Sequence, residues 1–329
     1  MSASFPYPLL NSTSMINLMN EMGHAAKPFL FVIDFHAQNG YVIAKDQLDA
    51  QFIRFAFHEQ SAKNQFDNIP KWKIYPVEKE IYARKFQYVK QQIQLGNSFL
   101  TNLTQPTGVS TNLNLEEIYQ YSYAPYKLWL KDQFVVLSPE TFVQMEQGII
   151  KTFPMKGTID AAVPDAETLI LNDEKEMAEH ATIVDLLRND LSIVAENVTV
   201  TRYRYVERIK TLQKDLLQVS SEISGVLPDD YLSNLGDILF KLLPAGSISG
   251  APKPKTLEII QEAEGYERGF YTGVCGYFDG QKLDSAVMIR FLEQTKDGLI
   301  YKSGGGVTFQ SEMEKEYQEL IQKVYVPVY

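Results

Sequence analysis

Short apolar runs of strand type, gathered in clusters, are the feature of this sequence that most limits its fold. Phe29–Phe35 predicts a buried strand, and turn residues at 38–40 lead into a second strand at Tyr41–Ile43. Further strands are expected at 99–103, 127–130, 134–137, 142–146, 149–153, 273–278 and 286–291. Single helical segments separate these clusters, which favours an α+β fold over a regular alternation of strands and helices.

Amphipathic spacing predicts helices at residues 78–95, 173–188, 254–263 and 312–324. Glycines that suit a helix C-terminus follow the first and the third of these, at Gly96 and Gly265. Capping boxes fit the start of the second and the fourth, as Asp173 with Glu176 and Ser311 with Glu314. The helical segments are therefore bounded by residues that match their ends.

The composition of the 329 residues is that of a globular protein, with 45% hydrophobic and 22% charged residues. A formal net charge of -10 argues against a nucleic-acid partner, which requires a basic face. The single cysteine, Cys275, allows no disulfide within the chain. The sequence shows neither a signal-peptide pattern nor an apolar run long enough for a bilayer. We therefore expect a soluble, cytoplasmic protein without a membrane partner.

Acidic residues occur at helical spacing in two of the predicted helices. Glu176 and Glu179 are three residues apart, and Glu316, Glu319 and Lys323 follow the same rule in the last helix. Carboxylates from two helices suit a hard cation such as magnesium and leave positions for water and substrate oxygen. Taken alone, such pairs are more typical of a solvated helix face.

Two loops of small residues precede helices. Ser303–Val307 carries three glycines in a row, which would let backbone N–H groups approach an anion, although a flexible turn has the same composition. Pro244–Lys253 opens a helix, whose N-terminal dipole favours negative charge.

Lys156 is held near the end of a predicted strand between Pro154 and Gly157, where it could be an electrostatic clamp, a nucleophile if desolvated, or an exposed turn lysine. Glu140 and Arg290 are single charges beside predicted strands, and burial would make them functional candidates.

In their order along the chain, these pieces resemble the chorismate-utilising enzymes. This family includes anthranilate synthase component I, aminodeoxychorismate synthase component I, isochorismate synthase and salicylate synthase. The resemblance covers nearly three quarters of the chain, from about Glu80 to Lys323. It is carried by residues 96–99, 138–140, 154–158, 173–180, 184–191, 244–253, 268–273 and 289–290, and by 304–306 leading to Glu316 and Glu319.

The resemblance implies one domain over residues 1–329, with a short N-terminal portion at 1–75 and a chorismate-binding core at 76–329. Two sheets rich in antiparallel pairs would pack face to face, with helices outside and the site in the central cleft. Magnesium, the implied cofactor, would be held by Glu176, Glu179, Glu316 and Glu319. Chorismate would contact Gly157, Thr158, Ser247, Tyr271, Arg290, Gly304, Gly306 and Lys323.

Lys156 indicates which member of the family the chain resembles most. The aminodeoxychorismate synthases have lysine at this place, whereas the other members usually have alanine. The resemblance implies that Lys156 attacks ring C2 while Glu140 protonates the departing C4 hydroxyl, and that ammonia then adds at C4 and expels the lysine. A nucleophilic lysine requires a lowered pKa and a general acid a raised one. The product would be 4-amino-4-deoxychorismate, the precursor of p-aminobenzoate and folate.

Ammonia would come from a separate glutamine amidotransferase subunit, because this chain offers no plausible Cys–His pair of its own. Anthranilate synthase component I is the alternative, and a binding protein without catalysis is a third interpretation. Two residues depart from the family pattern. Leu100 replaces a glutamine, or the lysine that activates water in isochorismate and salicylate synthases, and Gln218 replaces a histidine. Leucine cannot accept a proton, so Leu100 disfavours isochorismate and salicylate synthesis, whereas Gln218 disfavours pyruvate elimination and therefore anthranilate synthesis.

Overall fold

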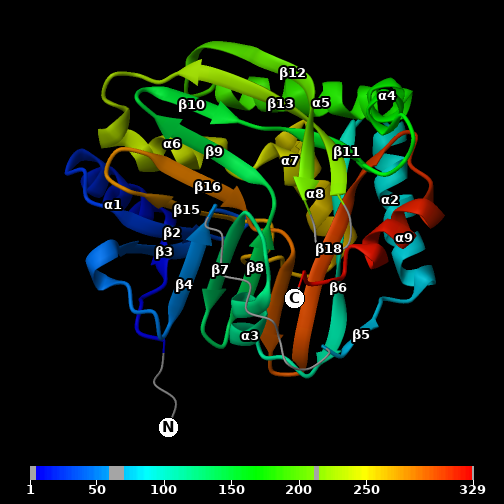
Figure 1. The fold of residues 1–329 in the computed structure, drawn as a ribbon, viewed down its shortest axis with the longest axis horizontal. Helices are drawn as coiled ribbons and strands as arrows, with labels where there is room; N and C mark the ends of the chain where they lie inside the picture. The colour runs from blue at the N-terminus through cyan, green and yellow to red at the C-terminus, as the bar shows by residue number, and fades with distance from the viewer. Residues whose placement is uncertain (1–4, 59–69, 211–214, 328–329) are drawn as a thin grey trace.

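The larger of two β-sheets forms one layer of the molecule (Figure 1). The computed structural model describes residues 5–58, 70–210 and 215–327, and within them this sheet has ten strands, all paired antiparallel. In spatial order these are β1 (Leu10–Asn11), β3 (Asn39–Ala44), β2 (Phe29–Ile33), β15 (Val274–Phe278), β16 (Leu283–Val287), β9 (Thr141–Glu146), β10 (Ile149–Thr152), β13 (Asp215–Val226) and β11 (Met155–Asp160), with β12 (Glu196–Lys210) paired to β13.

A second sheet, with eight strands in the described residues, is antiparallel as well. Its order is β14 (Gly250–Ala251), β6 (Leu100–Thr111), β18 (Gly298–Thr308), β17 (Phe291–Thr295), β8 (Phe134–Ser138), β7 (Tyr126–Leu130) and β4 (Ile53–Phe57), with β5 (Trp72–Tyr75) paired to β6. Of the strands within residues 10–57, β1, β2 and β3 belong to the larger sheet and β4 to the smaller one. The N-terminal portion therefore contributes strands to both sheets.

The two sheets pack face to face because successive side chains of a strand point to opposite faces. In β2, Leu30 and Val32 belong to a buried cluster that also contains Leu128 of β7 and Phe134 of β8. The alternate residue Phe31 belongs to another cluster on the opposite face. A strand buried on both faces explains why this segment is apolar throughout rather than alternating. The α+β fold with face-packed sheets is confirmed.

Helices cover the outer faces of both sheets. They are α1 (Ser12–His24), α2 (Lys79–Gln94), α3 (Leu115–Tyr121), α4 (Ala166–Asn172), α5 (Glu174–Leu191), α6 (Leu235–Leu242), α7 (Gly246–Ser249), α8 (Lys253–Glu264) and α9 (Met313–Gln322), with short 3-10 turns at Lys45–Gln47 and Tyr231–Asn234. The larger sheet carries α1, α5 and α6, whereas α3 packs on one part of the smaller sheet and α2, α8 and α9 on another.

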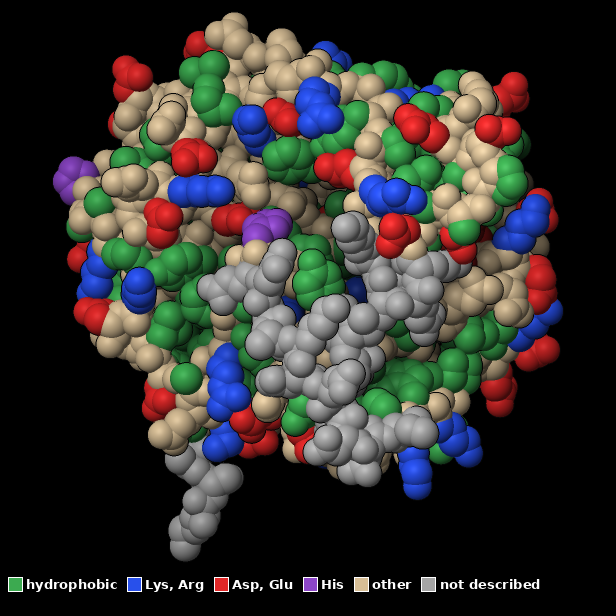
Figure 2. All heavy atoms as spheres, in the orientation of Figure 1, with side chains coloured by type: hydrophobic (Ala, Val, Ile, Leu, Met, Phe, Trp, Pro, Cys, Tyr) green, Lys and Arg blue, Asp and Glu red, His purple; other side chains and the backbone are tan. Residues whose placement is uncertain are grey.

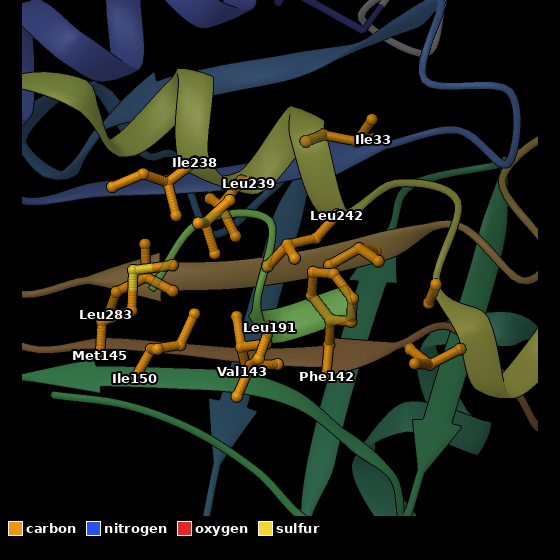
Figure 3. Close-up of a cluster of buried hydrophobic side chains, with 14 of the residues drawn as sticks. Ile33, Phe142, Val143, Met145, Ile150, Leu191, Ile238, Leu239, Leu242 and Leu283 are labelled. Atoms are coloured by element: carbon orange, nitrogen blue, oxygen red, sulfur yellow. The ribbon is translucent and has the colours of Figure 1, made fainter. Parts of the chain in front are cut away.

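The largest apolar cluster lies between the larger sheet and its helices, and Figure 3 shows part of it. Ile238, Leu239 and Leu242 of α6 point toward Phe142 of β9 and Leu283 of β16. Burial of side chains of this size contributes roughly 1.5–3 kcal/mol each relative to exposure. This cluster holds α5 and α6 in place behind the strands that line the functional site described below.

Most of the helix ends expected from the sequence are confirmed. Gly96 follows α2 and Gly265 follows α8, both with positive φ, and Asp173 accepts a hydrogen bond from the Glu176 N–H at 2.9 Å. The capping box expected at Ser311 is wrong. The Ser311 hydroxyl accepts from the Thr308 N–H instead, and Glu312 is the residue that precedes α9.

The strand expected at 286–291 is also wrong. It is two strands, because β16 ends at Val287 and β17 begins at Phe291. Arg290, between them, has a φ of 51°, which a regular strand cannot contain. The interruption separates a strand of the larger sheet from one of the smaller sheet, so the chain changes layers at this point.

Charged side chains of both signs are interspersed on the face of the molecule in Figure 2. On this face the described residues form no single basic patch. Among the helices in the described ranges, none combines the length and the apolar character needed to cross a bilayer.

Candidate active site

One large cavity lies where the two sheets meet the helices α5, α7 and α9. Its volume is about 620 Å³, within the range of small-molecule sites. It is lined by every residue that was predicted from the sequence to have a role in the site. These are Glu140, Lys156, Gly157, Thr158, Glu176, Glu179, Ser247, Tyr271, Arg290, Gly304, Gly306, Glu316, Glu319 and Lys323. The residues therefore share one site in the cleft between the sheets, while their individual roles remain predictions.

Lys156 reaches the cavity from an irregular point in β11. The pairing of β11 with β13 changes register between Met155 and Thr158, and Gly157 between them has a φ of 80°. A bulge with glycine in the left-handed region re-aims the neighbouring side chain. The Lys156 Nζ atom lies 2.7 Å from Glu179 Oε2 on α5. The bulge therefore brings the lysine ammonium against an acidic helix.

The charge state of Lys156 differs from the one expected. Burial lowers its pKa, but the carboxylates of Glu179, Glu176 and Glu319 outweigh burial, and the pKa lies above its ordinary value. The lowered pKa that a nucleophilic amine requires is therefore not found in this structure. Lys156 is an ammonium group held by acidic neighbours.

Glu140 lies between β8 and β9, where it lines the cavity. The Ser247 hydroxyl of α7 donates a hydrogen bond to Glu140 Oε1. Burial raises the pKa of Glu140, against the opposing effects of Ser247, Lys323 and Lys156. This is the direction that a general acid requires. The bond from Ser247 orients the carboxyl group, and the sequence had placed that serine only in a substrate-binding loop.

The acidic residues form two pairs on two helices. Glu176 and Glu179 lie on α5, and Glu316 and Glu319 lie on α9. Gly305 of β18 faces the second pair, since a Cβ atom there would lie 3.3 Å from Glu316 Oε2 and 3.6 Å from Glu319 Oε1. Burial raises the pKa of Glu176 and of Glu316, and the neighbouring carboxylate of each pair adds to the shift. The site thus concentrates negative charge that a cation would stabilise.

The donor types fit magnesium, which binds carboxylate oxygens. Within residues 5–58, 70–210 and 215–327, however, no three His, Cys, Asp or Glu side chains are grouped closely enough to hold a metal ion. Lysines balance the carboxylates instead: Lys156 pairs with Glu179, and Lys323 Nζ lies 2.6 Å from Glu319 Oε1. A cation at this site would have to replace these lysine contacts and draw the two glutamate pairs together.

The glycine-rich part of β18 borders the cavity with a free strand edge. β17 pairs with β18 only as far as Lys302, so from Ser303 onward the described strands leave that edge without a neighbour. On the other edge, Gly304 is opposite Thr104 of β6, where a Cβ atom would collide with the Leu103 carbonyl at 2.5 Å. The glycines therefore allow close strand packing and leave backbone groups available to a ligand.

Arg290 is fixed at the other side of these glycines. Its Nη1 atom donates to the Lys323 carbonyl at 3.1 Å, and the guanidinium lies 5.0 Å from the centre of the Tyr325 ring. Its positive φ is a strained conformation for a non-glycine residue. Tyr271 is buried nearby in the cavity wall. Together with the edge of β18, Arg290 offers donors suited to a carboxylate group.

Two ion pairs that support the site were not predicted from the sequence. Arg268 and Glu264 form a buried pair at 2.6 Å, and Arg268 Nη2 also donates to the Asn102 carbonyl at 2.7 Å. Lys253 pairs with Asp190 at 3.0 Å. The i, i+4 spacing of Glu264 and Arg268 is a signal for the first pair, although spacing alone does not show burial.

The two departures from the family pattern line the cavity as well. Leu100 is buried at the start of β6, and a Cβ atom on Gly306 would lie 2.9 Å from its side chain. Gln218 of β13 stands opposite Thr158 of β11. Neither leucine nor an amide transfers a proton as lysine or histidine can, so these two side chains supply no base to the cavity.

Several known proteins are similar to this chain in sequence. The chain is 50% identical to an uncharacterized PabA-like protein of Pasteurella multocida, over 96% of this chain and 98% of that protein. It is 31% identical to aminodeoxychorismate synthase component 1 of Salmonella typhimurium, over 89% of this chain and 66% of that one. It is 37% identical to an anthranilate synthase component 1 of Haloarcula marismortui, over 74% of this chain and 52% of that one.

Among solved structures, the menaquinone-specific isochorismate synthase of Escherichia coli has the same fold. The TM-score is 0.71 at 15% identity, covering 95% of this chain and 80% of that one. The sequence of residues 23–328 matches the chorismate binding enzyme family. With a cleft that gathers the residues of the family's motifs, this chain belongs to the chorismate binding enzymes.

Proposed function

We propose that this protein is a chorismate aminase that forms 4-amino-4-deoxychorismate from chorismate and ammonia. The observation that carries the proposal is Lys156, which a bulge at Gly157 directs into the shared cavity. Similarity to relatives named aminodeoxychorismate synthase component 1 supports the same reaction. An exposed lysine in a turn would point into solvent, whereas Lys156 contacts Glu179 of α5 and lines the cavity.

In this proposal, the two carboxylates of chorismate bind at opposite ends of the cavity. Arg290, Tyr271 and the backbone edge at Gly304 and Gly306 hold the enolpyruvyl carboxylate, for which they offer positive charge and hydrogen-bond donors. Magnesium, held by the four glutamates of α5 and α9, would supply positive charge to the ring carboxylate. Lys323 lies between the two regions, since its Nζ atom contacts both Glu319 and the Gly304 carbonyl.

The residues between these ends carry out the reaction. Glu140 donates a proton to the C4 hydroxyl, which leaves as water, while the Lys156 amine forms a bond to ring C2. Ammonia then forms a bond to C4, and the bond between C2 and the lysine breaks with the ring double bonds restored. The raised pKa of Glu140 suits the first step. Gly157 and Thr158, which line the cavity next to Lys156, would contact the substrate.

The ion pair of Lys156 sets a condition on this mechanism. As an ammonium group paired with Glu179, the lysine has no free electron pair. It must leave the pair and lose a proton before it can attack. We therefore expect Lys156 to become reactive only when other positive charge balances the carboxylates around it.

Ammonia is proposed to come from a separate glutamine amidotransferase subunit in the cytoplasm, and the product to serve p-aminobenzoate and folate synthesis. Anthranilate synthesis is the second candidate. It is favoured by the 37% identity to an anthranilate synthase component 1, which covers less of the chain than the aminodeoxychorismate synthase match does. Lys156 disfavours it, because the lysine would occupy C2, where anthranilate synthesis must place ammonia.

The test is to incubate the purified protein with chorismate, magnesium and an ammonium salt at mildly alkaline pH, and to identify products by mass spectrometry. We expect 4-amino-4-deoxychorismate without anthranilate, and no product after chelation of magnesium. Anthranilate as the main product would establish the second candidate instead. Bound chorismate that stays unchanged would indicate a binding protein.

A further inference from the structure

Tyr301 carries a buried polar group that the proposed mechanism does not use. It lies on β18 three residues before Gly304, opposite Thr107 of β6 and Leu292 of β17. Its side chain is only 1% exposed and lines the cavity. Within the described residues its hydroxyl group makes no hydrogen bond of good geometry, although the Arg290 side chain lies near enough to interact with it. Buried hydroxyl groups are normally paired, so this one is suited to a partner that enters the cavity.

The surroundings of this hydroxyl indicate what kind of partner it takes. Burial raises the pKa of Tyr301, while the nearby Arg290 guanidinium opposes the shift and Tyr325 adds to it. The hydroxyl therefore stays protonated and available as a donor. Arg290 is itself held by the Lys323 carbonyl and the Tyr325 ring, which fixes a positive charge beside the hydroxyl. A cation and a neutral donor next to each other match an anion with two oxygen atoms.

We propose that the Tyr301 hydroxyl donates a hydrogen bond to the same carboxylate that Arg290 binds, the enolpyruvyl carboxylate of chorismate. This inference rests on the proposed function and adds a specificity residue to it. Arg290 supplies charge that any anion would satisfy. Tyr301 supplies a second donor in a fixed place, and thereby selects an anion whose two oxygens span both groups.

If the Tyr301 hydroxyl had a purely structural role, its removal would lower the stability of the protein. The proposed role in binding predicts no such loss. The Tyr301→Phe change removes a buried hydroxyl that makes no hydrogen bond of good geometry within the described residues, so it should leave the stability of the protein unchanged or raise it. The same change should weaken chorismate binding roughly ten- to a hundredfold, as expected when a charged ligand loses a hydrogen bond. Binding and stability are thus expected to move in different directions.

The experiment is to titrate chorismate into wild-type and Tyr301→Phe protein by calorimetry, with magnesium present and ammonium absent. Shikimate, which has the ring carboxylate but no enolpyruvyl group, is the second probe. We expect weaker chorismate binding and unchanged shikimate binding in the variant. Tyr126→Phe is the matched control: this tyrosine is equally buried, bonds to Thr141 and Asp284, and lies outside the cavity lining. It should lose stability and keep its affinity for chorismate.

Chorismate affinity within twofold of the wild type in Tyr301→Phe would overturn the assignment. An equal loss for both ligands would overturn it too, because the effect would not depend on the enolpyruvyl group. The binding measurement involves no turnover. A wild-type protein that binds chorismate but makes no 4-amino-4-deoxychorismate would therefore end the proposed function and still leave the Tyr301 result readable.

Discussion

The Arg268–Glu264 pair and the Lys156–Glu179 pair join the same kinds of charge in different surroundings. The side chains of Arg268 and Glu264 are 2% and 1% exposed, whereas Lys156 is 27% exposed and lines the cavity. Glu264 also accepts bonds from the backbone and hydroxyl of Thr104. The first pair is therefore saturated with partners inside the protein. The second borders a space that a ligand can enter.

This difference separates a group that holds the fold from one that can change partners. A buried pair with all its bonds made cannot release either member without leaving a charge unpaired in the core. Lys156 has three N–H donors and can exchange one partner for another within the cavity. Of these two pairs, only Lys156–Glu179 lies beside the cavity, so only its lysine can lose and regain a proton during a reaction there.

The largest expected effect is on activity, in Lys156→Ala. The rate of 4-amino-4-deoxychorismate formation should fall about a thousandfold or more, as expected when the nucleophile of a covalent mechanism is removed. The free energy of unfolding should change by about 1 kcal/mol or less, since the pair is partly solvated. Steady-state kinetics and urea denaturation measure the two quantities.

Lys151→Ala is the control for this variant, because Lys151 pairs with Glu222 at 2.9 Å outside the cavity lining. It should keep full activity. If Lys156→Ala retained wild-type turnover, Lys156 would not be the nucleophile. A Lys156→Ala protein that unfolded as readily as a core variant would erase the distinction between the two pairs.

Arg268→Met should have the largest effect on stability. Removing one member of a buried ion pair costs about 3–5 kcal/mol, because the Glu264 carboxylate stays buried without its cation. Urea denaturation would show a lower midpoint with a similar slope. Lys255→Ala, at the exposed Lys255–Glu258 pair, should leave stability nearly unchanged. Equal losses in the two variants would mean that the burial of Arg268 has no energetic consequence.

The sequence predicted the composition of the site better than its electrostatics. The acidic helices and the glycines of 304–306 are local patterns, and motif order was enough to place them in one cleft. The bond between Ser247 and Glu140 joins residues far apart in the chain, so no local pattern reveals it. The pKa of Lys156 depends on carboxylates from two helices, whose distances only the folded chain defines.

The fold shows the same division between local and long-range information. The helix ends at Gly96 and Gly265 were predicted because a glycine in the left-handed region acts on its own neighbours. The break at Arg290 was missed because apolar residues on both sides continue a strand pattern. Its cause is tertiary: the chain passes from one sheet to the other at that residue.

Glu319→Gln tests the acidic side of the cavity. The magnesium concentration for half-maximal turnover should rise about tenfold or more, because an amide oxygen binds a hard cation less strongly than a carboxylate does. Glu314→Gln is the control, since Glu314 lies on the same helix, contacts Lys79 and does not line the cavity. An unchanged magnesium requirement in Glu319→Gln would remove this residue from the proposed metal site.

The smallest expected effect is a gain of stability in Glu140→Gln. The pKa of Glu140 lies above its ordinary value of 4.5 in the folded protein, so folding favours the protonated carboxyl group. The stability that this group contributes is complete below pH 4.5 and is lost as pH rises through the folded pKa. Glutamine stays neutral, so the variant should be more stable at neutral pH, by about 1 kcal/mol or less, and the gain should disappear near pH 4.

Thermal unfolding of Glu140→Gln and wild type between pH 4 and pH 8 measures this difference. Glu146→Gln, at an exposed position at the end of β9, is the control for the substitution itself. A constant difference between Glu140→Gln and wild type across the range would mean that Glu140 is ionised equally in the folded and unfolded states. The Glu140 carboxyl group would then lack the raised pKa that the proposed general acid needs.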